Sequence, residues 1–239
     1  MNMKIGNMLQ RKRPDTMVQR LGKVVIPLAL VVLLSGCGAL VTTPPAPIQA
    51  TASTHVIHPY PTAQGIRTIY QATLTQVYAG WPHDPACAFT SQGLAVHPQQ
   101  GLAYICLAPT KALTDFSLTA TAQQTSGSST HAYGLVFRHT SPHNYYFFGI
   151  DGTGHFTLAV VVNDISHVVL PFTSSSALHN GSHAVNQLQV IMKGKALTLL
   201  INGTAVGQAT LSTFAQGTVG LRGINNGVVL FTHLTIAYV

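Results

Sequence analysis

Residues 133–162, YGLVFRHTSPHNYYFFGIDGTGHFTLAVVV, decide the fold of this 239-residue chain. They contain three short apolar runs, and Asp151-Gly-Thr-Gly154 is a hairpin signal before the third run, Phe156–Val162. In Ala132–His139, every second residue is large and apolar, which places Tyr133, Leu135 and Phe137 on one face. The middle run, Asn144–Ile150, is apolar on both faces, which is typical of a central strand. The stretch therefore predicts neighbouring β-strands joined by tight turns.

The same alternation of apolar runs and turns continues on both sides. From Phe116 to Ala122, apolar residues alternate with Ser and Thr, which predicts a strand with one wet face. Further strands are expected at Val168–Phe172, Leu188–Met192, Leu197–Ile201 and Val228–Tyr238. The expected turns between strands are Asn163-Asp164, Asn180-Gly181, Lys193-Gly-Lys195 and Asn202-Gly203. With no amphipathic helical pattern and no internal repeat, the pattern predicts an all-β sandwich or barrel.

The charge composition supports strands and excludes one class of function. Charged residues are 7% of the chain, and every acid is Asp, so the Glu that exposed helix faces normally use is missing. The formal net charge is +7, but six of the basic residues precede the first apolar run. After Cys37, six basic residues stand against four acids, and they form no cluster. Nucleic-acid binding needs a clustered basic footprint, so we exclude it.

An export signal precedes the β-rich region. Basic residues up to Lys23 lead into the apolar run Val24–Leu34, and Ser35-Gly36-Cys37 follows it. This order of charged, apolar and small-residue segments defines a secretory signal. The tetrad Leu34-Ser-Gly-Cys37 resembles the lipobox of bacterial lipoproteins. That resemblance implies that the thiol of Cys37 receives a diacylglyceryl group and that Cys37 becomes the first mature residue, which anchors the protein to the membrane from outside the cytoplasm.

Two alternatives concern this N-terminal region. The segment Val24–Val41 could instead be an uncleaved membrane helix, although it is only 18 residues long and is interrupted by Pro27. Translation could begin at Met1 or at Met17, and a start at Met17 leaves a short cationic segment directly before the apolar run. We expect the start at Met17. The mature protein is the same in both cases.

The sequence predicts three regions. Residues 1–36 are the lipoprotein signal peptide, and residues 37–65 are a tether rich in Pro, Thr and Ala without hydrophobic periodicity. Residues 66–239 form the β-sandwich, which is long enough to bury one sizeable core.

Two cysteines remain once Cys37 is set aside. Cys87 and Cys106 both lie in the exported region, where thiols are oxidised, so we predict a disulfide between them. The intervening segment includes an expected hairpin around His97-Pro-Gln-Gln100. The alternative is two free buried thiols.

The strand pattern also resembles a known superfamily. Tyr133–His139 and Asn144–Ile150, together with Leu197-Thr-Leu-Leu-Ile-Asn-Gly203 and Gly217-Thr-Val-Gly-Leu221, are similar to the concanavalin A-like lectins and glucanases. The laminin G-like and 3-keto-disaccharide hydrolase-like jelly rolls are the most similar branches. The resemblance spans roughly Asp115 to Val239 and implies two stacked antiparallel sheets, with sugars often held on the concave one. The expected fold is therefore a two-sheet antiparallel jelly-roll sandwich, preceded by a signal peptide and a flexible tether.

The sequence departs from this superfamily where catalysis would be expected. Glucanase members carry a cluster of Glu and Asp on one strand, and this chain has none. Many relatives have a Trp near Val168–Phe172 and several have an acid in the final strand, where this chain has Pro171-Phe172 and Thr232. Glycoside hydrolysis normally needs two carboxylates beside the scissile bond, so we expect no enzyme.

Other chemistry has little support. The pairs His139-x3-His143 and His179-x3-His183 have a spacing that suits metals on a helix, but both fall in expected turns. No Gly-x-Ser-x-Gly elbow marks a nucleophile. We therefore expect neither a metal nor a cofactor.

Glycan binding is the function that the sequence favours. Sugar sites use aromatic faces and planar polar groups on an exposed sheet or loop. The candidate ligand-binding residues are Arg138, Asn144, Tyr145, Tyr146 and Trp81. The expected partner is a glycan or another polymer of the cell envelope. A structural or protein-interaction domain is the alternative, and a glycan-active hydrolase is the least favoured interpretation.

Overall fold

The computed structural model describes residues 67–97, 103–181, 183–224 and 226–239. The signal peptide, Cys37, the tether and the His97–Gln100 loop beyond His97 lie outside these residues. Every regular element in the described part is a β-strand, which confirms the predicted fold class. Among the described residues, no helix has the length and apolarity needed to cross a membrane.

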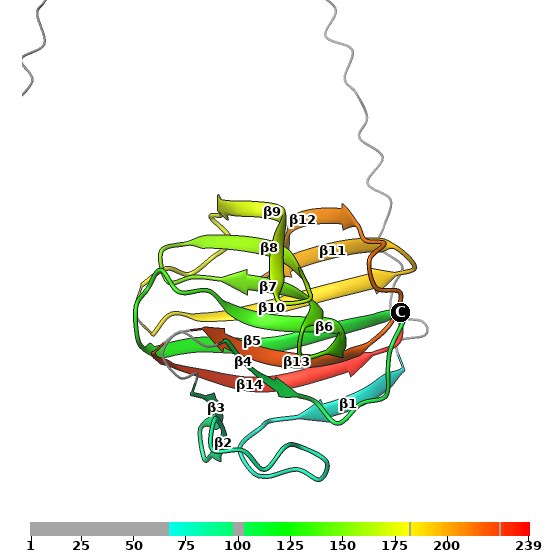
Figure 1. Cartoon of the computed structure of the whole chain (residues 1–239). Helices are drawn as coiled ribbons and strands as arrows, with labels where there is room; N and C mark the ends of the chain where they lie inside the picture. Colours follow the sequence, from blue (N-terminus) through cyan, green and yellow to red (C-terminus); the bar gives the residue numbers. More distant parts are fainter. Residues whose placement is uncertain (1–66, 98–102, 182, 225) are drawn as a thin grey trace, which may run out of the picture. The chain divides into compact units, whose positions relative to one another are not determined.

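The strands form two sheets that stack face to face (Figure 1). The larger sheet has eight strands in the order β12-β11-β10-β5-β14-β3-β2, with β1 also paired to β14. Its strands are β1 (Thr68–Ala72), β2 (Cys87–Thr90), β3 (Gly93–Val96), β5 (Phe116–Ser126), β10 (Val185–Lys193), β11 (Ala196–Ile201), β12 (Thr204–Thr210) and β14 (Val228–Ala237).

The smaller sheet has six strands in the order β4-β13-β6-β7-β8-β9. Its strands are β4 (Ala103–Leu107), β6 (Tyr133–Ser141), β7 (Asn144–Ile150), β8 (His155–Val162), β9 (Ile165–Ser174) and β13 (Thr218–Ile224). All of the pairings between neighbours are antiparallel. The expected central position of Asn144–Ile150 is confirmed, because β7 lies between β6 and β8 and is buried on both faces.

The core lies between the two sheets. The predicted one-face set Tyr133, Leu135 and Phe137 points into it, and the alternation of β5 buries Phe116 and Leu118. The two-residue turns form as expected, because Asn163, Asp164 and Asn202 all adopt the positive φ that such turns require. The sequence pattern therefore fixed the inner faces of these strands correctly.

One expected connection is wrong. A hairpin around His97–Gln100 would pair the strands on its two sides, but β3 pairs with β2 and β14 whereas β4 pairs with β13. The chain therefore passes from one sheet to the other between these two strands. A Pro and polar residues between two short apolar runs are compatible with either connection, so local turn signals alone do not distinguish them.

The predicted disulfide is confirmed and joins the two sheets. Cys87 on β2 is bonded to Cys106 on β4, with the two Cα atoms 5.8 Å apart. β2 is an edge strand of the larger sheet and β4 is an edge strand of the smaller one. The bond therefore fastens the sheets together along one side of the sandwich.

We expect the Cys87→Ala/Cys106→Ala variant to lose about 3 kcal/mol of unfolding free energy, because the bond closes a loop with a sequence separation of 19. Urea unfolding under non-reducing conditions measures the loss. As a control, dithiothreitol should lower the wild-type midpoint and leave that of the variant unchanged. A wild-type midpoint that dithiothreitol does not alter would contradict the stabilising role.

Candidate functional site

The outer faces of the two sheets differ in chemistry. On the larger sheet, the outward residues are mainly Ser, Thr and Gln, as in Ser117, Thr119 and Gln189. On the smaller sheet, the outer face carries a second apolar cluster. Its buried members are Ala132, Val136, Tyr145, Phe147 and Val161, with Ile105 packed against them.

A groove of about 590 Å³ lies on this apolar outer face. Ile105 and Leu107 of β4 line one side, and Val161 of β8 lines the other. Tyr104, His139, Tyr145 and Arg222 supply aromatic and polar groups, and Pro142, Asp164 and Ser166 belong to the turns and strand starts at its rim. The groove is therefore mostly apolar with a few polar groups that converge on it, as ligand sites usually are.

Arg222 is the central cation of the groove. It lies on β13, directly opposite Ile105 on one neighbouring strand and Gly134 on the other. Its guanidinium carbon lies 4.3 Å from the centroid of the Phe147 ring and 5.6 Å from that of Tyr145. Cation–π contact of this kind is favourable for Arg because the guanidinium is flat and weakly hydrated.

Two glycines make room beside this cation. Gly134 and Gly149 are cross-strand partners next to Arg222 on the outer face. A Cβ at Gly149 would come within 2.6 Å of the Phe147 ring, so that ring lies over the glycine. The missing side chain at Gly149 lets Phe147 lie against the sheet, with Arg222 over its face.

His139 stacks on Tyr145 at the other end of the groove. The ring centroids are 6.0 Å apart, with an interplanar angle of 24°. Burial lowers the pKa of His139 below its ordinary value. The imidazole is therefore neutral at pH 7, which leaves Arg222 as the fixed positive charge of the groove lining.

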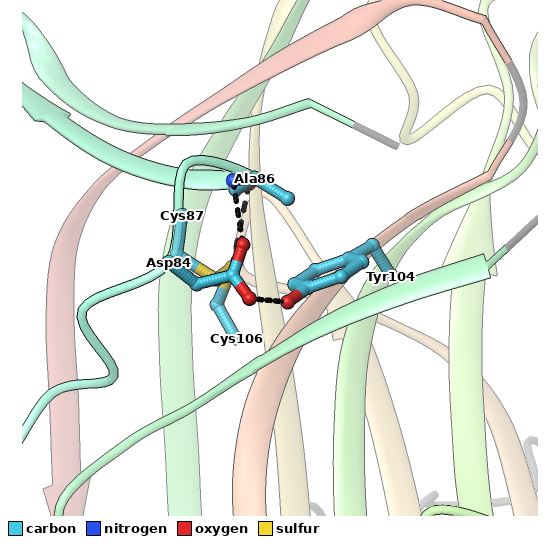
Figure 2. The surroundings of a disulfide bond; sticks show 5 residues. All are labelled: Asp84, Ala86, Cys87, Tyr104 and Cys106. Atoms are coloured by element: carbon cyan, nitrogen blue, oxygen red, sulfur yellow. Dashed lines mark hydrogen bonds between the residues drawn. A yellow bond between two sulfur atoms is a disulfide. The ribbon is translucent and has the colours of Figure 1, made fainter. Parts of the chain in front are cut away.

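Figure 2 shows the side chain of Tyr104 pointing toward Asp84, beside the disulfide. Its hydroxyl donates a hydrogen bond to Asp84, whose other oxygen accepts one from the Ala86 amide at 2.8 Å. The bond to Asp84 is the main cause that raises the pKa of Tyr104 to about 12, and the same bond lowers the pKa of Asp84. Asp84 is therefore ionised and committed to its neighbours at neutral pH.

Asp164 at the groove rim also has a partner. Its carboxylate lies 2.7 Å from Nδ1 of His143, and both side chains are largely exposed. The turn amide of Asp164 donates to the carbonyl of His143, so the pair joins the β6–β7 and β8–β9 turns.

Of the five predicted ligand residues, Tyr145 lines the groove. Asn144 lies next to it, but its side chain is occupied by structural hydrogen bonds. It donates to the Ser141 hydroxyl at 2.9 Å and accepts from the Asn163 amide at 3.0 Å. Asn144 therefore joins two turns of the smaller sheet.

Trp81 and Tyr146 do not form an exposed platform, which corrects that expectation. Trp81 is 3% exposed, and its indole N–H donates to the hydroxyl of Tyr70 at 2.8 Å. Tyr146 is 1% exposed, and its hydroxyl accepts from the Thr213 amide at 2.9 Å. Both residues have the large apolar surface that a core favours, and both find a buried partner for their polar atom.

Arg138 is also buried, because the strand does not alternate regularly there. It has a φ of +47°, and the β6–β7 and β6–β13 registers both shift around it. This bulge removes the side chain from the outer face. Its terminal nitrogens donate to the carbonyls of Phe214 at 2.9 Å, Thr114 at 3.1 Å and Gly194. Arg138 therefore joins three connections at one end of the sandwich.

The predicted candidates Arg138, Tyr145 and Tyr146 therefore do not form one site. Arg138 and Tyr146 both hold the 211–217 connection, whereas Tyr145 points to the groove. Arg222, which lies opposite Gly134, was missed. The signal that could have found it is the alternation of β13, where Val219 and Leu221 are core residues and Arg222 is on the other face.

The members of the two histidine pairs have separate partners. His143 contacts Asp164, and His179 contacts the carbonyl of Val185. In the described part of the chain, no group of three or more His, Cys, Asp or Glu side chains is arranged to hold a metal ion.

Comparison with known proteins establishes the fold. No protein-family profile matches the sequence, and no curated protein matches it. Among solved structures, the carbohydrate-binding module CBM66 from Bacillus subtilis is similar, with a TM-score of 0.58, 18% identity, and coverage of 66% of this chain and 95% of that one. A galectin-like protein of unknown function from Bacillus subtilis has a TM-score of 0.55 at 12% identity, covering 72% and 96%. The β-glucanase of Bacillus licheniformis has a TM-score of 0.53 at 8% identity, covering 74% and 100%.

These structures share the two-sheet sandwich, so the fold that the strand pattern predicted is confirmed. Identities this low carry no information on individual site residues.

We expect Arg138→Met to lower the unfolding free energy by about 3 kcal/mol, because it removes three charge-assisted hydrogen bonds made by a side chain that is 2% exposed. The matched control is Lys193→Met, an exposed cation near the same turn, which should change stability by less than about 0.5 kcal/mol. Urea unfolding of both variants measures the difference. Equal losses in the two variants would show that Arg138 has no special structural role.

Proposed function

We propose that this protein is a lipid-anchored, non-catalytic module that binds a glycan of the cell envelope in the groove on its six-stranded sheet. The observation that carries the proposal is the asymmetry of the two outer faces. One carries mainly Ser, Thr and Gln, and the other presents a groove lined with Tyr145, Arg222 and His139.

A sugar fits this chemistry. Pyranose rings present C–H surfaces that pack on apolar and aromatic side chains, and hydroxyls that bond to planar polar groups. The groove offers Ile105 and Val161 for the first kind of contact, and Arg222 and Asp164 for the second. Its volume of about 590 Å³ is within the usual range for small ligands.

The absence of catalysis is supported by the state of the carboxylates. Glycosidases normally place two carboxyl groups about 5–10 Å apart across the bond that they cleave. Within the described residues, Asp164 is the acid that lines the groove, and it is paired with His143. Asp84, near the wall, is bonded to Tyr104 and to the Ala86 amide. No second carboxylate in this part of the chain faces Asp164 across the groove.

The solved structures with this fold are compatible with the proposal. One of them is named a carbohydrate-binding module and another a β-glucanase. The first name favours binding without catalysis. The second name is compatible with a hydrolase, but the arrangement of the carboxylates in this chain disfavours that interpretation.

The lipid anchor supplies the cellular context. A thioether-linked lipid at Cys37 would hold the protein at the outer side of a membrane, and residues 38–65 would form the spacer. An extended chain spans about 3.3 Å per residue, so this spacer could reach roughly 90 Å into the envelope. At that distance from the membrane, the groove could bind polymers that lie beyond the membrane surface.

A protein-interaction domain is the second candidate, and the edge strand β9 favours it. Ile165, Val168 and Phe172 on this strand are exposed by 62%, 66% and 54%. Exposed apolar side chains on a sheet edge are typical of a surface that pairs with another chain. This candidate predicts a protein partner and no glycan ligand.

We expect Ser166→Trp to abolish glycan binding, because the indole would fill the groove from an exposed position on β9. Ser174→Trp is the matched control, since it lies on the same strand, is equally exposed and does not line the groove. A glycan array followed by calorimetry compares the variants with the wild type. The proposal fails if the array finds no ligand or if both variants bind alike.

For the anchor, we expect Cys37→Ala to abolish both labelling with radioactive fatty acid and partitioning into a detergent phase. Cys87→Ala/Cys106→Ala is the control, because it removes the other cysteines and should still be labelled. Unchanged labelling in Cys37→Ala would contradict the lipoprotein interpretation.

A further inference from the structure

We propose that the glycan bound in this groove is acidic, a uronic acid polymer or oligosaccharide whose carboxylate pairs with Arg222. This inference rests on the proposed glycan-binding function and adds the chemical class of the ligand. The guanidinium of Arg222 is oriented by two aromatic rings. Phe147 lies under it at 4.3 Å and Tyr145 is beside it at 5.6 Å, so contact with the rings leaves the N–H groups at its edge as the polar part available to a ligand.

The edge of this guanidinium has no acceptor in the described part of the chain. Nε of Arg222 is buried without a hydrogen-bond partner, and the terminal nitrogens make none of the hydrogen bonds found there. Nε of Arg138 also lacks a partner, but the terminal nitrogens of that residue donate to three carbonyls. Nε of Arg222 is thus a desolvated donor without a partner, and the terminal nitrogens, which are not among the buried atoms, are the donors that a ligand in the groove can reach.

The charges around Arg222 do not neutralise it. The titratable groups that line the same groove are Tyr104, His139, Tyr145 and Asp164. Tyr104 is protonated and bonded to Asp84, and His139 is neutral at pH 7. Asp164 is the one lining carboxylate among the described residues, and it is shared with His143 at 2.7 Å. A guanidinium stays charged in a protein, so the ligand is the remaining source of a counter-charge.

Carboxylate is the anion that suits this geometry. The two terminal nitrogens of a guanidinium lie in one plane, and each can donate an N–H to one oxygen of a carboxylate, which gives a bidentate pair that does not need the buried Nε. A uronic acid carries such a carboxylate on a ring that can pack on the apolar wall formed by Ile105 and Leu107. A neutral sugar would bury the cation further without pairing it, which is unfavourable.

The test uses full-length protein purified in a mild non-ionic detergent. The probes are oligogalacturonate and oligoglucuronate, together with the same oligosaccharides after reduction of their carboxyl groups to hydroxymethyl groups. A sulfated oligosaccharide and a glycerol-phosphate polymer test the other anions. We expect the carboxylated probes to bind at least about 30-fold more tightly than the reduced ones, as for truncation of one member of a buried charge pair. Ser166→Trp should abolish binding of every probe.

Arg222→Gln should abolish the preference for the carboxylated probe, whereas Arg222→Lys should retain part of it, because Lys keeps the charge but not the planar fork. If Arg222→Gln fails to fold, the wild type still provides a readout. Its affinity for the carboxylated probes should fall as sodium chloride is raised, whereas its affinity for the reduced, neutral probes should not.

The outcomes separate the two proposals. If neutral and carboxylated probes bind equally and Ser166→Trp blocks both, the groove binds glycans but the acidic class is wrong. If only the sulfated or phosphorylated probe binds, the assignment to a carboxylate is wrong. If no probe and no glycan on the array binds, both the acidic class and the proposed function are overturned.

Discussion

Side chains on a β-strand alternate between the two faces of its sheet, and β6, β7 and β8 carry apolar residues on both faces. The inner set, including Phe148 and Leu158, is covered by the eight-stranded sheet. The outer set has no second sheet above it among the described elements. It is instead buried by its own side chains, with the ring of Phe147 over Gly149 and Arg222 over that ring. Arg222 thus lies where it covers an apolar ring that would otherwise be exposed to solvent.

The wall of the groove and the stability of the sandwich depend on the same strand. β4 carries Tyr104, Ile105 and Leu107 along the groove, and Cys106 between them is bonded to the other sheet. β4 is an edge strand that pairs with β13 alone, so its ladder fixes it from one side. The disulfide and the bond from Tyr104 to Asp84 supply the other restraints. The β13 ladder, the disulfide and the bond to Asp84 together fix β4, so Ile105 stays opposite Arg222 on β13.

Much of the fold could be predicted because its signals are local. Alternation in Phe116–Ala122 and turns such as Asn202-Gly203 depend on neighbouring residues, and the structure has both. The hairpin expected near His97 was wrong, because pairing of β3 and β4 is decided by β14 and β13, more than 100 residues away in sequence. The site residues were harder to predict from the sequence than the strands. Trp81 and Tyr146 have the right residue type for a sugar platform, but type alone does not specify the face on which a residue lies.

The two arginines of the smaller sheet show where such prediction ends. Regular alternation would put both Arg138 and Arg222 on the outer face of the smaller sheet. The bulge at Arg138 turns it away, and carbonyls from three separate connections then satisfy it. Those acceptors come from remote parts of the chain, so no local pattern marks them. Arg222 remains in register and receives no such acceptors among the described residues. A cation that the fold satisfies is structural, and one that the fold desolvates without satisfying is the more informative guide to a ligand.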